Sequence, residues 1–309
     1  MGRVVCGFPL EDGPVLVTGA GGFAGRFVME RFGLGSGDFA SDLSADFQAP
    51  AGVERIAWSL PGPAPASLGP VRYVIHLAGL SSVARSSQGS APVIEVNAKG
   101  TRSVADWLEA ACPGARILLA SSAEVYRPSG EALTEDSSLE PRSPYGESKL
   151  MAERILAERD IDWVISRSFP HFGPWQQAHF VLPSFCRRII RAVREGIAEI
   201  PVGNLQAVRD YLYVEDVVKA YASLLSRGRR GGIYNVCSGR GHSIGEMLEL
   251  LMKISGSRVK AVTDPGLLRG SDQFRQVGDP TKLEDLGWRA EVQLEDGLRM
   301  LYSWWEERT

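Results

Sequence analysis

The chain has 309 residues, of which 44% are hydrophobic and 23% are charged, and its formal net charge is -3. This composition is typical of a globular protein with one large core or two smaller ones, and it lacks the basic stripe that binds nucleic acid. Because no apolar run reaches the ~18 residues of a membrane span and the N-terminus lacks a signal-peptide layout, we expect a cytoplasmic protein with no membrane partner.

The first recognisable structural unit covers residues 15–32. A β-branched run is followed by Gly19, Gly22 and Gly25, which form G-x-x-G-x-x-G, and then by apolar residues at helical spacing. Such glycines permit a tight turn and let the backbone approach a pyrophosphate, which rests on the helix N-terminus. A glycine triplet alone is often only a flexible loop, but its place between a strand and a helix predicts a dinucleotide site. We assign no role to residues 1–13.

The next strand should carry the residue that binds the adenosine ribose of the cofactor. Asp42 is our candidate for the 2′-hydroxyl, which would favour NAD, and Asp46 is a candidate contact for the adenine. Arg26, just after the last loop glycine, would instead hold the 2′-phosphate of NADP. The alternatives are a surface carboxylate and a surface arginine, and the choice between NAD and NADP stays open.

Residues 71–79 predict another buried strand, which ends in two small residues. Small residues there would let a cofactor lie over the strand end. Ser81 and Ser82 follow, and they face the same opening if the sheet is parallel. A long helix is then predicted over residues 91–111.

The strand predicted over residues 115–123 ends in hydroxyl side chains, and a carboxyl side chain follows it. These are Ser121, Ser122 and Glu124. In open α/β sheets, ligands bind outside the carboxyl ends of the strands. Serines at a strand end are otherwise turn formers, but these lie one strand-helix unit before a tyrosine–lysine pair.

That pair begins the next helix. Ser143 can cap the helix and Pro144 fits its first position, which places Tyr145 and Lys149 four residues apart on one face. A neighbouring ammonium would favour the phenolate, so the tyrosine could donate or accept a proton near neutral pH. Alone this motif is weak, because most such pairs are solvated surface pairs.

The alternation of strands and helices up to residue 168 predicts an α/β fold, a Rossmann doubly wound parallel sheet. Beyond it the pattern changes to a smaller C-terminal α/β substrate-binding domain, with helices expected near 180–195, 243–254, 280–286 and 293–306. We predict a cofactor-binding domain formed by residues 1–169 and about 212–237, and a second domain formed by about 170–211 and 238–309. A cleft between the two suits a second ligand.

The cysteines and histidines predict no metal site. The four cysteines are scattered without a CxxC pair, so we interpret them as buried thiols in a reducing compartment. The four histidines form no HxxxH pair. We therefore expect no bound metal.

Seven strings occur in the order and approximate spacing of a known family: TGAGGFAG, HLAG, VNAKGT, SSAEVY, PYGESKLMAE, RDYLYVEDVVKAY and YNVCSG. With them the chain resembles the extended short-chain dehydrogenases/reductases over nearly its full length. The strings RSFPHFGP, AHFVLPSF and DPGLLRGSD are similar to those of GDP-6-deoxy-4-keto-mannose reductases and GDP-mannose 4,6-dehydratases.

The resemblance implies a site and assigns roles to its residues. Catalytic roles fall to Ser122, Tyr145, Lys149 and Glu124. Binding of NADP or NAD falls to Gly19, Gly22, Phe23, Gly25, Arg26, Asp42, Asp46, Leu77, Ala78, Gly79, Asn97, Tyr145 and Lys149. Binding of a nucleotide-sugar substrate, GDP-linked by resemblance, falls to Ser81, Ser82, Glu124, His171, Val181, Val202, Asn204, Arg209, Arg269 and Asp272. Relatives also imply a homodimer through the helices at about 91–111 and 144–159.

Two departures from the family pattern bear on the substrate and the reaction. Pro170 stands where the family has an asparagine that contacts substrate, and proline offers neither an amide side chain nor a backbone donor. Dehydratases of this branch use a glutamate together with a neighbouring Asp or Ser, whereas this chain has Glu124 beside Ala123. Alanine can neither donate nor accept a proton.

The resemblance and Ala123 together favour a reductase. We expect NAD(P)H-dependent reduction of a nucleotide-linked 4-keto-6-deoxy sugar, GDP-4-keto-6-deoxy-D-mannose to GDP-D-rhamnose. A GDP-mannose 4,6-dehydratase, a nucleotide-sugar 4-epimerase and a non-catalytic dinucleotide sensor are the alternatives.

Overall fold

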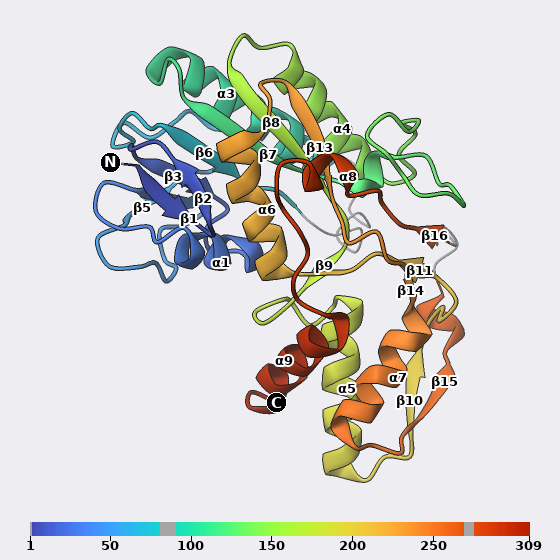
Figure 1. Cartoon of the computed structure of the whole chain (residues 1–309). Coiled ribbons are helices and arrows are strands. Elements are labelled where there is room, and N and C mark those ends of the chain that lie inside the picture. Colours follow the sequence, from blue (N-terminus) through green and yellow to red (C-terminus); the bar gives the residue numbers. More distant parts are fainter. Residues whose placement is uncertain (1, 81–90, 269–274) are drawn as a thin grey trace.

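The computed structural model describes residues 2–80, 91–268 and 275–309. Its centre is a parallel sheet of seven strands in the order β13-β8-β7-β6-β3-β4-β5 (Figure 1). The strands are β3 (Val15–Thr18), β4 (Phe39–Asp42), β5 (Glu54–Ala57), β6 (Tyr73–His76), β7 (Arg116–Ser122), β8 (Asp162–Ser168) and β13 (Gly232–Val236). The chain reverses its direction of travel across the sheet between β3 and β6, which is where such sheets bind ligands. The predicted doubly wound fold is confirmed.

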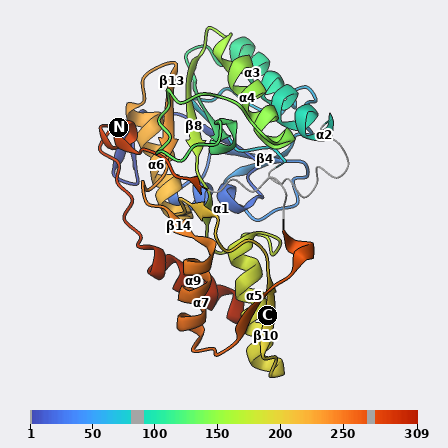
Figure 2. The same cartoon turned by 90° about the vertical axis from the view of Figure 1, so that its right-hand side faces the viewer.

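Side chains alternate across the sheet because successive residues of a strand point to opposite faces. Val15 and Val17 of β3 join one hydrophobic cluster, together with residues of α1 (Phe23–Arg31) and α6 (Val214–Arg227). Leu16 joins a second cluster on the other face, with residues of α3 (Gly100–Ala111) and α4 (Pro144–Ala157). Figure 2 shows α3 and α4 together on one side and α6 on the other.

The remaining elements form a smaller lobe below the carboxyl ends of the strands, as Figure 1 shows. Its helices are α5 (Val181–Glu195), α7 (Ile244–Ser255) and α9 (Leu294–Glu306), whereas α8 (Thr281–Glu284) lies beside β13 of the large sheet. Its strand pairs are β9 (His171–Phe172) with β12 (Leu212–Tyr213), and β10 (Glu199–Val202) with β15 (Lys260–Thr263). A third small sheet has the order β14-β11-β16, from His242–Ser243, Val208–Arg209 and Arg275–Gln276.

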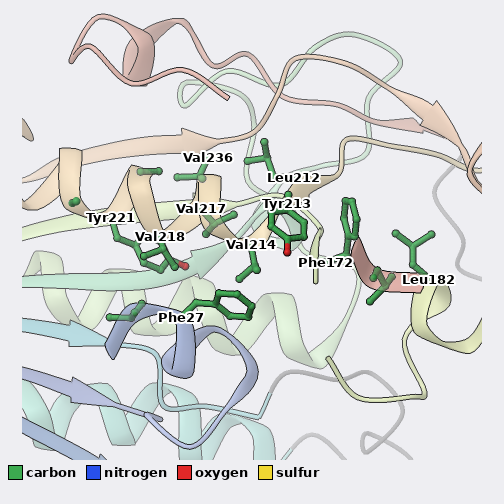
Figure 3. Close-up of a cluster of buried hydrophobic side chains, with 14 of the residues drawn as sticks. Phe27, Phe172, Leu182, Leu212, Tyr213, Val214, Val217, Val218, Tyr221 and Val236 are labelled. Carbon is green, nitrogen blue, oxygen red and sulfur yellow. The ribbon is translucent and has the colours of Figure 1, made fainter. Parts of the chain in front are cut away.

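One hydrophobic cluster joins the lobe to the large sheet. It runs from Phe27 of α1 and Val217 of α6 through Phe172 of β9 to Leu182 of α5 (Figure 3). Buried apolar contact over this length resists separation of the two parts. The domain boundaries given above remain a prediction.

The N-terminal residues, to which the sequence assigns no role, form a hairpin of β1 (Arg3–Val5) and β2 (Phe8–Leu10). Phe8 is 3% exposed and packs in the main cluster. Arg3 pairs at 3.0 Å with Asp38, whose carboxylate also accepts the backbone N–H of Val15 at 2.9 Å. The hairpin therefore covers the amino ends of β3 and β4.

The helix expected over 91–111 is confirmed, and it contains a π-helical turn, Glu95–Lys99, between α2 (Ala91–Ile94) and α3. One sequence prediction needs correction. The sequence predicts four buried cysteines, but Cys6 is only half-buried in the β1–β2 turn, whereas the other three are buried. Within the described ranges, no helix has the length and apolar character needed to cross a membrane.

Candidate functional site

The glycine loop forms a close-fitting cradle at the strand end. Gly19 has a φ of +70°, and a Cβ there would lie 2.7 Å from the backbone nitrogen of Ala78. A Cβ on Gly25 would lie 2.5 Å from the carbonyl oxygen of Gly19. Only glycine permits these approaches. Gly22 is the N-cap of α1, so the free N–H groups of its first turn fit a pyrophosphate.

Two groups proposed for the adenosine side adjoin this loop. The Asp42 carboxylate accepts the N–H of Gly21 at 2.9 Å, so it lies against the glycine loop. The Arg26 guanidinium lies 4.6 Å from the ring centre of Trp175, a residue of the smaller lobe. Arg26, Asp46 and Trp175 line a cavity of about 960 Å³, whose other walls come from residues 47–53 and Arg55.

Trp175 is a residue that the sequence patterns do not single out. Its φ of +70° is a left-handed conformation that is uncommon for a side chain of this size. It is 45% exposed and lies 5.3 Å, ring centre to ring centre, from Trp304 of α9. A tryptophan after proline in a loop carries no pattern, so only the fold brings it to Arg26.

Asn97 connects the end of β6 to the catalytic helix. Its Oδ1 accepts the N–H of Leu80 at 2.7 Å, and its Nδ2 donates to the hydroxyl of Ser148 at 2.9 Å. Ser148 in turn donates to the carbonyl oxygen of Tyr145 at 2.7 Å. A Cβ on Gly79 would lie 2.7 Å from Asn97 Oδ1 and 3.6 Å from Lys149 Nζ. Asn97 lies in the π-helical turn, a feature that often marks functional sites.

The predicted start of the catalytic helix is confirmed. The hydroxyl of Ser143 accepts the N–H of Gly146 at 3.0 Å, and Pro144 occupies the first turn. A Cβ on Gly146 would collide with the carbonyl oxygen of Glu124, so this glycine lets α4 begin close against the residues that follow β7. The helix therefore starts where the strand ends.

The predicted catalytic side chains meet across this junction. The hydroxyl of Ser122 lies beside the phenol of Tyr145 and lowers its pKa as a hydrogen-bonding partner. Lys149 Nζ donates to the carbonyl oxygen of Ala120 at 2.8 Å and lies 5.9 Å from the ring centre of Tyr145. A hydroxyl, a phenol and an ammonium are thus gathered at the carboxyl end of β7.

The pKa of Tyr145 is raised in the structure, although Lys149 lies nearby. Burial raises the pKa of Tyr145 above its ordinary value, the hydrogen bond from Ser122 opposes this, and the charge of Glu124 adds to it. Burial lowers the pKa of Lys149 to about 8, against the charge of Glu153. Removal from water disfavours both charged forms. At neutral pH Tyr145 is therefore a protonated phenol, which suits a proton donor.

Glu124 lies in the short 3-10 helix Ala123–Val125 that follows β7. Its Oε2 accepts a hydrogen bond of 3.4 Å from the hydroxyl of Ser143. The neighbouring Ala123 is buried, and its carbonyl oxygen accepts the amide of Gln276 at 3.2 Å. The carboxylate near Tyr145 thus has a methyl side chain as its neighbour.

The residues proposed to bind substrate are placed in part. The ring of His171 stacks on Phe23 of the glycine loop, with 5.8 Å between ring centres. Arg209 lies in β11, where its Nη1 donates to the carbonyl oxygen of Val208 at 2.9 Å. Asn204 accepts the N–H of Gln206 within a turn.

The other proposed substrate residues differ in what the structure says of them. Val181 is the first residue of α5, and the side chain of Val202 is fully buried in β10. Ser81, Ser82, Arg269 and Asp272 lie outside the described residues.

Comparison with known proteins gives consistent matches. Residues 70–301 match the family model described as GDP-mannose 4,6 dehydratase. The chain is 37% identical over 245 residues to GDP-6-deoxy-D-mannose reductase of Pseudomonas aeruginosa, across 76% of this chain and 80% of that protein. The solved structure of RMD from Pseudomonas aeruginosa complexed with NADPH has a TM-score of 0.81 and 31% identity, covering 96% of this chain and 100% of that one.

A second solved structure carries the other cofactor. UDP-glucose 4-epimerase of Thermus thermophilus, solved as a complex with NAD, has a TM-score of 0.80 and 27% identity. The match covers 96% of this chain and 99% of that chain. The same fold therefore holds NADPH in one relative and NAD in another.

Proposed function

This chain belongs to the GDP-mannose 4,6-dehydratase family of extended short-chain dehydrogenases/reductases, and we propose that within it the chain is a nucleotide-sugar 4-ketoreductase. It is an NAD(P)-dependent oxidoreductase, as its relatives are. The favoured reaction is reduction of GDP-4-keto-6-deoxy-D-mannose to GDP-D-rhamnose. The observation that carries the choice is Ala123, the methyl neighbour of Glu124.

Ala123 leaves the site without one of the two proton-transfer groups that dehydration needs. Dehydration of a hexose needs one group to remove the C5 proton and another to help water leave from C6. Glu124 can supply the first, but Ala123 has no proton to give or take. Reduction of a ketone needs only one proton donor beside the hydride source, and a protonated Tyr145 meets that need.

The proposed mechanism assigns one task to each side chain. A reduced nicotinamide, when bound, supplies the hydride that adds to C4 of the sugar. Tyr145 donates its hydroxyl proton to the carbonyl oxygen as negative charge develops there, and the product is an alcohol. The hydroxyl of Ser122 hydrogen bonds to the same oxygen, and the Lys149 ammonium stabilises the phenolate that Tyr145 becomes. Asn97 fixes the start of α4 through Ser148.

The glycine loop and Gly79 fit an NAD(P) cofactor. The cradle formed by Gly19 and Gly25 has room for backbone alone, and the first turn of α1 has no side-chain cap at Gly22. Gly79 keeps the space beside Asn97 and Lys149 free of a side chain. These features would hold the pyrophosphate and the nicotinamide ribose, respectively.

Incubation of the purified protein with two substrates tests the proposal. With GDP-4-keto-6-deoxy-D-mannose and NADPH or NADH, we expect oxidation of the reduced cofactor and formation of a GDP-deoxyhexose. Absorbance at 340 nm measures the first, and chromatography detects the second. With GDP-mannose and no added reductant, we expect no turnover. Consumption of GDP-mannose in that second reaction would instead identify a dehydratase.

An epimerase and a dinucleotide sensor would each behave differently from a reductase. A 4-epimerase would convert a nucleotide sugar into its C4 epimer without net oxidation of added cofactor, and UDP-glucose serves as the probe. A dinucleotide sensor would bind NADPH and turn over none of these substrates. Neither result would be mistaken for that of a reductase.

A further inference from the structure

Three consecutive residues at the end of β7 contact three successive turns of α4. The hydroxyl of Ser122 meets Tyr145, the carbonyl oxygen of Ala120 accepts Lys149 Nζ, and the hydroxyl of Ser121 donates to Glu153. Residues four apart share one face of a helix, so Tyr145, Lys149 and Glu153 form a continuous row. The third member of this row has no role in the mechanism above.

Glu153 is buried and fully engaged. Its side chain is 5% exposed, and that of its ion-pair partner, Arg167 of β8, is 3% exposed. Arg167 Nη2 donates to Oε2 at 2.8 Å and Nε donates to Oε1 at 3.1 Å. The remaining Arg167 donor contacts the Tyr126 hydroxyl and the carbonyl oxygen of Glu135, each at 3.1 Å. The carboxylate is therefore held in one orientation by side chains of two adjacent strands, β7 and β8.

A buried ion pair is a costly way to stabilise a fold. Apolar side chains of similar volume often stabilise a protein as well or better, because two charges must be taken out of water. The position of Glu153 explains the presence of this ion pair better than stability does. Glu153 lies one helical turn beyond Lys149 and touches the strand that carries Ser122.

We propose that Glu153 is a positioning residue for the proton-transfer pair: held by Ser121 and Arg167, it aligns α4 with β7 and supplies the negative charge that faces the Lys149 ammonium. This inference deepens the proposed function and rests on it for the role of Lys149. Glu153 touches neither substrate nor cofactor.

The other groups around Lys149 do not supply that charge. On α4 the neighbour is Tyr145, which is neutral at neutral pH. On β6 it is His76, whose pKa is lowered to about 3 by burial and by Lys149 itself, so it is uncharged. The π-helical turn contributes the neutral Asn97, and β7 contributes a carbonyl oxygen. Over the described part of the chain, Glu153 is the anion that acts on Lys149.

Loss of the Glu153 charge should lower the pKa of Lys149. Burial lowers the pKa of Lys149 to about 8 and the Glu153 charge opposes this, so removing the charge lowers the pKa further. The ammonium would then be lost at lower pH. Because Tyr145 holds its proton to higher pH than Lys149, the alkaline fall of kcat/KM for reduction should follow Lys149 and move to lower pH by roughly one unit.

The test compares Glu153→Gln with Glu153→Asp and Glu147→Gln. We expect the alkaline limb to move down in Glu153→Gln, to return toward its original position in Glu153→Asp, and to stay in place in Glu147→Gln. Glu147 lies two residues from Lys149 on the exposed face of α4, so this control removes the same charge without the contact. An unmoved limb in a folded Glu153→Gln, or an equal shift in the control, overturns the proposal.

A second measurement separates this proposal from the proposed function. The chain has few lysines, so ¹³Cε-lysine NMR can follow Lys149 directly, with Lys149→Met to assign its signal. We expect the Lys149 titration to move down by roughly one pH unit in Glu153→Gln without any substrate. If it moves and no nucleotide sugar is reduced, the proposed function fails and this inference stands. If reduction occurs and the titration is unmoved, the inference fails.

Glu153→Gln leaves Arg167 buried and unpaired, so this variant can fail to fold. A further variant keeps the proposal testable in that case. The double variant Glu153→Leu with Arg167→Met replaces the pair by apolar side chains. We expect it to fold and to show the same downward shift of the Lys149 titration. A titration at the original pH in this protein also overturns the proposal.

Discussion

Lys149 Nζ is hydrogen bonded to the carbonyl oxygen of Ala120 at 2.8 Å, so this lysine is anchored to the strand that also carries Ser122. This bond keeps the ammonium 5.9 Å from the ring centre of Tyr145, a position from which it stabilises negative charge on the phenol. Proton donor and counter-charge are thus set by one strand and one helix.

Tyr145→Phe should abolish reduction while cofactor binding stays. Removal of a general acid lowers turnover by about 10²–10⁴-fold, and the phenyl ring preserves the packing. Reduction of the 4-keto sugar is followed at 340 nm, and NADPH binding by fluorescence titration. Tyr73→Phe is the control, because it removes a hydroxyl that accepts the N–H of Glu11 at the far end of the sheet. Full activity in Tyr145→Phe would refute its assigned role.

Gly79→Ala should lower turnover strongly. The new Cβ would lie 2.7 Å from Asn97 Oδ1, so the Asn97 side chain, which holds the start of α4 through Ser148, must move. Because a misplacement of 1 Å can cost 10²-fold, we expect a loss of at least about tenfold in kcat. Gly130→Ala is the matched control, since its Cβ would meet nothing within 4 Å. Equal kcat in the two variants would contradict the proposed importance of this contact.

Arg26→Ala should weaken the binding of NADPH more than the binding of NADH. A guanidinium on the cavity wall can bind a 2′-phosphate with a charged hydrogen bond, so we expect a loss of about tenfold in affinity for adenosine 2′,5′-bisphosphate. Trp175→Ala should lose less of this affinity, because it removes only the ring that orients Arg26. Calorimetry measures the affinity of each variant for adenosine 2′,5′-bisphosphate and, for comparison, its affinity for ADP.

Arg31→Ala serves as the control for the cofactor experiment. Arg31 lies at the opposite end of α1 and pairs with Glu215 at 2.6 Å. An equal loss of ADP affinity in Arg26→Ala would show that Arg26 does not select the 2′-phosphate, and Asp42 would then be the residue to test for NADH.

Because His76 is buried in its neutral form, the free energy of unfolding should fall as the pH is lowered. His76 is buried between the hydroxyls of Thr18 and Thr101, at 2.7 and 3.1 Å, and burial lowers its pKa to about 3. The unfolded chain binds the proton first, so the stabilisation is complete above the ordinary pKa of 6.5 and is lost as the pH falls through 6.5 toward 3.

The comparison with His76→Asn measures this contribution. Between pH 7 and pH 4.5 the wild-type protein should lose about 2–3 kcal/mol more unfolding free energy than the variant, by urea denaturation at both pH values. Equal pH dependence in the two proteins would show that His76 is not buried in its neutral form.

Phe8→Ala should destabilise the protein by about 3–5 kcal/mol, the usual cost of a large cavity. Phe8 is 3% exposed, whereas Val4 on the same hairpin is 72% exposed. Val4→Ala should therefore change the free energy of unfolding by less than about 0.5 kcal/mol. Similar losses in the two variants would argue against a structural role for the hairpin.

Local signals in the sequence were sufficient for the sheet, the glycine loop and the cap at Ser143, whereas the roles of Tyr145 and Lys149 came from the family resemblance. These signals depend on neighbours in the chain: alternation along a strand, spacing of four along a helix, and the backbone freedom of glycine. They also placed Ser121 and Ser122 at the carboxyl edge of the sheet, one strand-helix unit before Tyr145, because parallel strands present their carboxyl ends together.

Tertiary structure alone decided the electrostatics and the long-range partners. The protonated state of Tyr145 follows from burial, which the spacing of two residues cannot show. Arg26 meets Trp175, and Glu153 meets Arg167, because different elements fold against each other. The sequence alone determined which side chains are proposed to carry the chemistry, and the packing decided what charge each one holds, since that depends on exclusion of water.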